Sequence, residues 1–287
     1  MRRLAIGSAV ATSSESEVVE VSLLDPRNGE AFDLPIAENP PKTYVVASTP
    51  RTGSTLLCRL LWDLDCVGAP KEYLNPMQMR DWEVRMGDSA AWRFFCACLR
   101  GPAVGLLGQR EWKPEELRRY VERIRQRRTS AGGFFGIKIH RHHFEKFFGE
   151  GKISLEETLA PRQWIFLRRM DRVAQAVSWS RALQSGRWAS HQKFAFPVVY
   201  RRRQIGKLIE QIEAQEAAWE RYFQARQIEP LRLRYEDLVE DRAAVLRLVL
   251  EYLGAAKASG ITVPELDFER QSDDLNRLWI ERYREES

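Results

Sequence analysis

One segment of this chain, residues 44–57, constrains the fold more than any other. It begins with an apolar stretch suited to a buried strand, continues into the short turn Pro-Arg-Thr-Gly-Ser-Thr around Gly53, and ends in the leucine-rich start of an amphipathic helix. Unpaired N–H groups at a helix start carry partial positive charge and bind anions, and a glycine lets the backbone approach the bound group closely. The segment therefore predicts a phosphate-binding loop at the end of a strand.

The loop differs from the one that binds nucleoside triphosphates. The pattern Gly-x-x-x-x-Gly-Lys-Ser/Thr needs a first glycine where Ser48 or Thr49 stands, and a lysine where Ser54 stands. The cation of this loop, Arg51, comes before the glycine instead. The missing lysine argues against a P-loop kinase, which would consume ATP with magnesium.

Short apolar segments alternate with helical patterns along the rest of the chain. The segments are apolar on both faces, as in a parallel sheet covered by helices. We therefore predict an α/β fold, a P-loop-like doubly wound parallel sheet flanked by helices, with ligands bound at the carboxyl ends of the strands. The predicted strands are residues 43–47, 134–139, 163–167 and 231–233. The helical patterns cover residues 56–64, 173–182, 205–219 and 245–252 and a further helix that starts at Pro114.

Length and charge set broad limits on the protein. At 287 residues, the chain is long enough to bury a full core. We expect residues 43–287 to form one domain and residues 1–42, with seven acids against four bases, to form an N-terminal accessory arm. The net charge of +5 suits a small anionic ligand as well as nucleic acid. Six arginines between Arg118 and Arg128 lie mostly off an apolar stripe, which predicts a solvated helix face.

Cysteine usage and hydropathy indicate a cytoplasmic protein. The four cysteines include no Cys-x-x-Cys pair, so reduced thiols are expected. No apolar run approaches the roughly eighteen residues of a membrane span, and we expect no transmembrane segment. The apolar stretch after Arg3 is short and interrupted by Gly7 and Ser8, which argues against a signal peptide.

A second polar group follows the strand predicted at residues 163–167. Arg169 comes at the end of this strand, and Ser178 lies on the helix after it. An arginine fork pairs with two phosphate oxygens at once, and a hydroxyl adds a third donor. The two residues resemble those that hold the 3′-phosphate in sulfotransferases that use 3′-phosphoadenosine 5′-phosphosulfate (PAPS). The turn at residues 50–55 resembles the 5′-phosphosulfate loop of the same enzymes.

Several motifs in the same order extend this resemblance to bacterial carbohydrate sulfotransferases of the trehalose 2-sulfotransferase type. They are residues 47–57, 70–73, 136–138, 169–182, 219–223, 269–271 and 279–284. The resemblance implies a sulfotransferase fold, PAPS as the donor, no metal, a sugar or glycolipid acceptor, no nucleic acid and a possible homodimer. The donor-binding residues that it implies are Arg51, Thr52, Gly53, Ser54, Thr55, Arg169, Ser178 and Arg270.

The implied reaction is an in-line transfer of the sulfuryl group to an acceptor hydroxyl. Arg51 and the loop amides would stabilise the charge that builds on the leaving oxygen. The acceptor proton needs a base, and two residues compete for this role. Glu72 matches the glutamate base of the trehalose enzymes, and burial beside a sugar would raise its pKa toward neutrality. His140 is the rival, because Lys-Ile-His resembles the Lys-Thr-His of animal cytosolic sulfotransferases. We favour Glu72.

Three questions remain open on the sequence. His140, His142 and His143 suggest a metal site, but no carboxylate or thiol partners them at ligand spacing, so we expect no metal. Lys138 either contacts the sulfate or pairs with a nearby acid. The third question concerns function, because a nucleotide-binding module of the same fold without turnover would carry the same loop.

Overall fold

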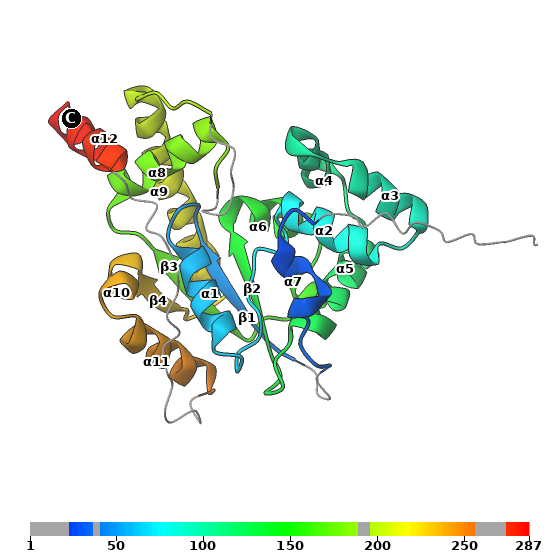
Figure 1. The fold of residues 1–287 in the computed structure, drawn as a ribbon. Coiled ribbons are helices and arrows are strands. Elements are labelled where there is room, and N and C mark those ends of the chain that lie inside the picture. The colour runs from blue at the N-terminus through cyan, green and yellow to red at the C-terminus, as the bar shows by residue number, and fades with distance from the viewer. Residues whose placement is uncertain (1–22, 37–40, 189–195, 256–273, 287) are drawn as a thin grey trace, which may run out of the picture.

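The computed structural model of the protein describes residues 23–36, 41–188, 196–255 and 274–286. Figure 1 shows the arrangement of their helices and strands. The leader-like start of the chain, Arg270 and the motif at residues 269–271 lie outside the described residues. No helix within the described part is long and apolar enough to cross a membrane.

A parallel sheet forms the centre of the molecule (Figure 1). Its strands are β1 (Lys42–Ser48), β2 (Phe134–His140), β3 (Gln163–Arg168) and β4 (Leu231–Arg234). Their order is β2-β1-β3-β4, and each neighbouring pair is parallel. All four predicted strands are confirmed, each to within one residue at either end, and the predicted α/β fold class is correct.

Both faces of β1, β2 and β3 are buried under helices, as their apolar sequences predict. The edge strand β4 differs from the prediction, because its two arginines are exposed. Tyr44 and Val46 point into one core, while Val45 and Ala47 point into the other, because successive side chains of a strand alternate. The first core packs against α1 (Ser54–Asp63), α10 (Tyr235–Glu240) and α11 (Arg242–Leu253). The second core packs against α5 (Pro114–Arg128), α6 (Arg141–Phe148) and α9 (Arg202–Ala225).

The remaining helices extend the molecule beyond the two covered faces. Figure 1 shows α3 and α4 at one end and α12 beside α8 at the other. These helices are α2 (Pro76–Met86), α3 (Ala90–Cys98), α4 (Gly105–Gln109), α7 (Leu155–Thr158), α8 (Arg172–Ser185) and α12 (Asp274–Glu285). The short 3-10 helices of the described residues are η1 (Pro26–Asn28), η2 (Glu30–Phe32) and η3 (Gly101–Val104).

The carboxyl ends of the strands lie along one edge of the sheet. Ser48 at the end of β1 pairs with His140 at the end of β2, and Arg168 of β3 pairs with Arg234 of β4. The chain leaves β1 toward β2 on one side and reaches β3 on the other, so β1 is the point where the strand order reverses. Ligands of such sheets bind at this point, and the loop at residues 49–53 follows directly.

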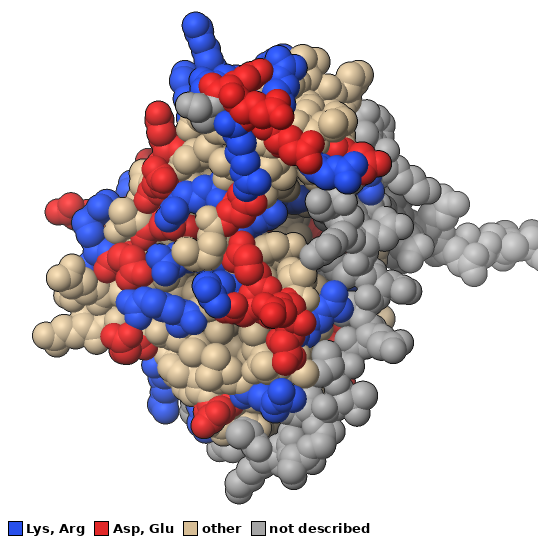
Figure 2. All heavy atoms as spheres, turned by 90° about the vertical axis from the view of Figure 1, so that its left-hand side faces the viewer, with Lys and Arg blue, Asp and Glu red and all other residues tan. Residues whose placement is uncertain are grey.

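Charges of both signs share the surface beside the edge strand β4. Figure 2 shows lysines and arginines interspersed with acids over this face. Two ion pairs of β4 are formed by Arg232, which lies 3.0 Å from Glu220, and by Arg234, which lies 2.6 Å from Asp237. Exposed pairs of this kind are screened by solvent and add little to stability. The site at the carboxyl ends of the strands differs from this surface, because positive charges gather there.

Candidate active site

The loop after β1 has the geometry of an anion cradle. Gly53 adopts a left-handed conformation (φ 82°) at the N-cap of α1, and no side chain caps this helix start. Arg51 is also left-handed (φ 65°), which is uncommon for a residue with a side chain. A Cβ added to Gly53 would lie 2.3 Å from Cδ2 of Tyr235, so only glycine fits against that ring. The first-turn N–H groups of α1 are therefore available to a ligand.

Side chains from two other helices hold the loop in place. Gln175 on α8 donates to Thr49 Oγ1 (2.8 Å) and to the Pro50 carbonyl (2.7 Å). The indole N–H of Trp219 on α9 donates to the Ser48 carbonyl at 3.1 Å. Both donors are buried, and buried hydrogen bonds fix geometry because breaking them leaves a polar group unpaired. The loop is thus preorganised rather than dependent on a ligand for its shape.

The two predicted anion-binding groups meet in space. Nε of Arg51 donates to Oγ of Ser178 at 3.0 Å, and Nη1 donates to the Trp188 carbonyl at 2.8 Å. Burial lowers the pKa of Arg51 to about 10, and the nearby positive charges of Arg169 and Arg181 act in the same direction. The three arginines, two in the segments after β1 and β3 and one on α8, therefore repel one another unless an anion lies between them.

Arg169 has the features expected of an anion ligand. Its guanidinium lies over the ring of Tyr235, 4.7 Å from the centroid. Its Nε is buried and has no hydrogen-bond partner among the described residues. A buried donor without a partner is unfavourable, and a bound phosphate oxygen would satisfy it. Because the same ring contacts Gly53, Tyr235 links the loop to Arg169.

A second cluster surrounds Glu72, which precedes α2. Nζ of Lys138 lies 2.7 Å from Glu72 Oε2 and donates to Thr55 Oγ1 at 3.1 Å. Nε2 of His140 lies 3.4 Å from Oε2 of the same carboxylate, and Nδ1 of His143 lies 3.2 Å from Oε1. The two sequence candidates for the base are therefore neighbours, and Lys138 joins them to the anion-binding loop.

The charge state of Glu72 differs from the sequence expectation. Burial alone would raise the pKa of Glu72, but attraction from His140 and Lys138 and the contact with His143 outweigh it and hold the pKa well below its ordinary value. The expectation of a raised pKa was wrong for this state of the protein, because it considered burial without the neighbouring cations. Glu72 is ionised at neutral pH.

The partners of His140 assign its tautomer. Burial lowers the pKa of His140 more than Glu72 raises it, so the imidazole is neutral at pH 7. Nε2 faces a carboxylate that can only accept, so Nε2 carries the proton. Nδ1 lies 3.0 Å from Ser48 Oγ and accepts from that hydroxyl. Both ring nitrogens are then engaged, whereas the Glu72 carboxylate has further lone pairs.

The histidines are closer to a carboxylate than sequence spacing indicated. Glu72 contacts both His140 and His143, although we expected no carboxylate partner for them. Burial, with the neighbouring His143 and His140, lowers the pKa of His142 to about 3. Within the described residues, no group of His, Cys, Asp or Glu side chains has the arrangement of a metal site.

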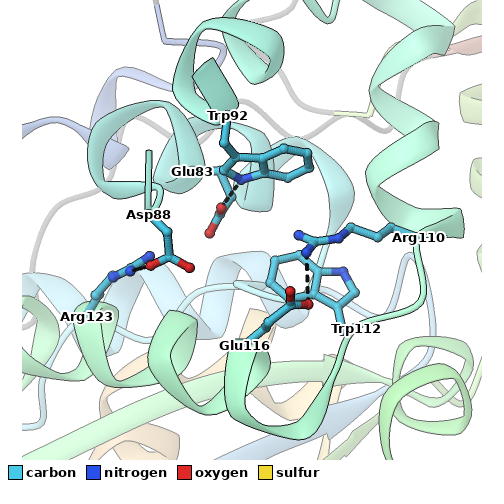
Figure 3. Close-up of a pocket in the computed structure, with 7 residues that line it drawn as sticks. All are labelled: Glu83, Asp88, Trp92, Arg110, Trp112, Glu116 and Arg123. Atoms are coloured by element: carbon cyan, nitrogen blue, oxygen red, sulfur yellow. Dashed lines mark hydrogen bonds and ion pairs between the residues drawn. The ribbon is translucent and has the colours of Figure 1, made fainter. Parts of the chain in front are cut away.

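A cavity of about 180 Å³ lies apart from these clusters, between α2, α3 and α5. Figure 3 shows that its charged groups face one another: Arg110 lies between Trp92 and Trp112, 4.6 Å from each ring, and pairs with Glu116 at 2.8 Å. Arg123 pairs with Asp88 in the same way. None of the predicted site residues within the described part of the chain lines the cavity. Because its charges are mutually satisfied and Arg110 covers the tryptophan faces, we assign it no chemistry.

Gly53 offers a direct test of the cradle. We expect Gly53→Ala to destabilise the protein by clearly more than Gly133→Ala, a matched control with φ 78° and nothing within 4 Å of the added methyl group. The control should cost about 1–2 kcal/mol for the left-handed backbone alone. Gly53→Ala adds the overlap with Tyr235. Urea unfolding measures both, and equal losses would show that the Tyr235 contact does not constrain the loop.

The fold and the strand-end site define an α/β protein suited to an anionic ligand. Comparison with family models matches residues 43–286 to Stf0 sulphotransferase. The chain belongs to the Stf0 sulphotransferase family. The family resemblance drawn from the sequence is therefore confirmed.

Two curated relatives carry the name trehalose 2-sulfotransferase. The protein of Mycobacterium tuberculosis (strain Erdman) is 24% identical over 267 residues, covering 86% of this chain and 96% of the relative. The protein of Mycolicibacterium smegmatis is 26% identical over 271 residues, with the same coverage of both chains.

Solved sulfotransferase domains are also similar. A domain from the curacin biosynthetic pathway matches with a TM-score of 0.43 and 19% identity, covering 80% of this chain and 77% of that domain. A domain from the Synechococcus PCC 7002 olefin synthase matches with a TM-score of 0.40 and 17% identity, covering 88% of this chain and 98% of that domain.

Sequence reasoning missed several residues that the tertiary structure brings to the site. Tyr235 follows a short strand and carries no motif, and Gln175 reads as an ordinary helix residue. Arg181 lies one helical turn after Ser178, which places both on one face of α8 and was a usable signal. These residues are Ser48, His143, Gln175, Arg181 and Tyr235.

Proposed function

We propose that this protein transfers the sulfuryl group of PAPS to a hydroxyl of a carbohydrate or glycolipid. Family membership supports sulfate transfer. The observation that carries the choice of donor is the 3.0 Å hydrogen bond between Arg51 and Ser178. It joins the loop after β1 to the arginine and hydroxyl group after β3, so one ligand with two separate anionic groups fits both.

The residues of the two groups suit the two ends of such a donor. The amides of Gly53, Ser54 and Thr55, with Arg51, would hold the phosphosulfate end. Arg169 and Ser178 would hold the 3′-phosphate, whose oxygens would satisfy the orphaned Nε of Arg169. The donor supplies the activated sulfuryl group. The charge of Arg181 also favours an anion at this place.

In the proposed transfer, the acceptor oxygen forms a bond to sulfur while the bond from sulfur to the bridging phosphate oxygen breaks. Arg51 and the loop amides stabilise the negative charge that develops on that bridging oxygen. The acceptor proton passes to Glu72. Lys138, now shared between Glu72 and Thr55, lies where it can turn toward the sulfate, and this movement would raise the proton affinity of Glu72.

The carbohydrate class of the acceptor rests on the relatives. Both curated relatives are named trehalose 2-sulfotransferases and align along 96% of their length. Trehalose is therefore the first acceptor to test, followed by other glycans and lipid-linked sugars.

Donor binding and turnover are tested in sequence. We expect adenosine 3′,5′-bisphosphate, but not AMP, to raise the melting temperature, because a ligand that binds only the native state stabilises it. Transfer of radiolabelled sulfate from PAPS to trehalose and other sugars then tests catalysis. Stabilisation without transfer to any acceptor supports a nucleotide-binding module, and equal stabilisation by AMP contradicts the 3′-phosphate site.

The pH profile of Lys138→Met tests the base cluster. A general base becomes protonated as pH falls through its pKa, and activity is then lost. A base with a lowered pKa therefore stays active to lower pH. Removing Lys138 takes away a charge that lowers the pKa of both Glu72 and His140. We therefore expect the acid limb of kcat/KM to move to higher pH in this variant.

The exposed Lys152→Met is the matched control and should leave the limb in place. An unchanged limb in Lys138→Met would place the base outside this cluster.

A further inference from the structure

Residues 23–33, which precede the part of the chain matched by the family model, contact the segment that carries Glu72. We propose that Asp25 and Asn28 anchor Lys71 and thereby orient the neighbouring Glu72 for catalysis. Residues 23–33, the N-terminal segment, would then be a positioning element of the active site rather than a separate arm. This inference rests on the proposed function, because it assigns an effect to the base.

Lys71 is held by two side chains of the N-terminal segment. Its Nζ lies 2.9 Å from Asp25 Oδ2 and donates to Asn28 Oδ1 at 2.7 Å. Lys71 is largely buried, with 13% of its side chain exposed. Burial lowers the pKa of Lys71 to about 8, while the attraction of Asp25 opposes the loss of its proton. Both contacts therefore stabilise a buried ammonium that would otherwise be costly.

The backbone converts this anchor into an orientation for Glu72. Lys71 forms a parallel bridge with Ile137 of β2, and its carbonyl accepts from the N–H of Lys138 at 2.9 Å. Successive side chains of extended backbone point to opposite sides. The Lys71 side chain accordingly reaches the N-terminal segment, while the Glu72 side chain reaches Lys138 and His140. Fixing Lys71 on one side limits the rotation of Glu72 on the other.

The segment is itself firmly attached to α2. Asn28 is completely buried, and its amide nitrogen donates to Asp81 Oδ2 and to Gln78 Oε1, each at 2.9 Å. The backbone N–H groups of Leu24 and Asp25 donate to the same Asp81 carboxylate at 2.9 and 2.8 Å. The side-chain amide of Asn28 therefore links Lys71 to α2: its oxygen accepts from Lys71, and its nitrogen donates to side chains of α2.

A second attachment lies on α5. Arg128, buried at the end of this helix, donates to the carbonyls of Arg27, Gly29 and Phe32. The sequence predicted a solvated face for the arginines of α5, and Arg128 contradicts this because the N-terminal segment covers it. The segment (dark blue in Figure 1) thus lies against the domain between α2 and α5.

Asp25→Asn tests the link with the least disturbance, because the change is isosteric. We expect kcat for sulfate transfer from labelled PAPS to fall roughly tenfold, since small misplacements of a catalytic group can cost up to about a hundredfold. KM for PAPS should stay unchanged, because Lys71 contacts the N-terminal segment and β2 rather than the proposed donor-binding residues. Glu30→Gln, an exposed change in the same segment, is the matched control.

Two further measurements separate positioning from general support. In Asp25→Asn, backbone amides at residues 71–75 should exchange hydrogen faster, while those at residues 48–56 should not. The double variant Asp25→Asn with Lys71→Met should lose no more kcat than Lys71→Met alone, since both changes break one link. Additive losses, or a shared loss of donor binding and melting temperature, would overturn the proposal.

The proposal and the proposed function can fail separately. If the wild-type protein transfers no sulfate, the proposed function fails, and the exchange measurement still tests whether Asp25 anchors residues 71–75. If transfer occurs and Asp25→Asn keeps wild-type kcat and exchange rates, the positioning role is wrong.

Discussion

Replacing Arg51 with methionine is expected to reduce kcat/KM for sulfate transfer by about a thousandfold, the loss typical of removing a preorganised donor to developing charge. Arg51 is the one cation within the loop after β1, and its hydrogen bond to Ser178 links that loop to the group after β3. The variant should also bind adenosine 3′,5′-bisphosphate weakly. Titration calorimetry and transfer of labelled sulfate measure the two effects.

The melting temperature of the ligand-free Arg51→Met variant provides a second test of the loop. Because Arg169 and Arg181 repel Arg51, removing its charge should leave the melting temperature of the free protein unchanged or higher. Arg59→Met is the control, because Arg59 lies on α1 and pairs with Asp63 at 2.7 Å. Wild-type nucleotide affinity in Arg51→Met would contradict the assignment of the loop.

Glu72→Gln is expected to lower kcat by roughly a hundred- to ten-thousandfold, the usual contribution of a positioned base. Glutamine keeps the shape of the side chain, but it replaces one accepting oxygen with an NH2 donor and cannot take the acceptor proton. Affinity for adenosine 3′,5′-bisphosphate should remain, because Glu72 contacts Lys138 and His140 rather than the proposed nucleotide-binding residues. Steady-state rates with saturating donor and acceptor measure the loss.

His140→Asn distinguishes the two candidate bases. Because both ring nitrogens of His140 are engaged, by Glu72 and by Ser48, we expect this variant to lose less kcat than Glu72→Gln. A larger loss in His140→Asn, with Glu72→Gln near the wild-type rate, would assign the base to the histidine. Full activity in both variants would place the base elsewhere.

Most of the fold could be predicted because the strands β1, β2 and β3 are buried on both faces. A strand covered on two sides leaves a continuous apolar run, and such runs predicted β1, β2 and β3 to within a residue at each end. The position of β4 was predicted equally well, although its two arginines are exposed. The glycine after β1 likewise predicted the turn and the start of α1. The short helices between α2 and α5 could not be placed, because packing rather than a regular pattern determines them.

The candidate site was predictable only in part. Arg51 and Arg169 each follow a strand, and parallel strands end at one edge, so their proximity followed from topology. Glu72 was recognised as a candidate base, and pairing with an acid was one of two alternatives for Lys138. That the acid is Glu72, and that the pKa of Glu72 is lowered, was not foreseen. The contact between Tyr235 and Gly53 was also missed, because no local pattern marks a ring that packs across the sheet edge.

The sequence by itself determined the elements and the loop, because strand burial, helix periodicity and glycine conformation are local properties of the chain. Only the tertiary structure decided which charges meet. Lys138 lies between Glu72 and Thr55, and Asn28 reaches Lys71, through contacts between segments far apart in the chain. Electrostatic effects depend on distance and burial, and neither quantity can be read from residue order.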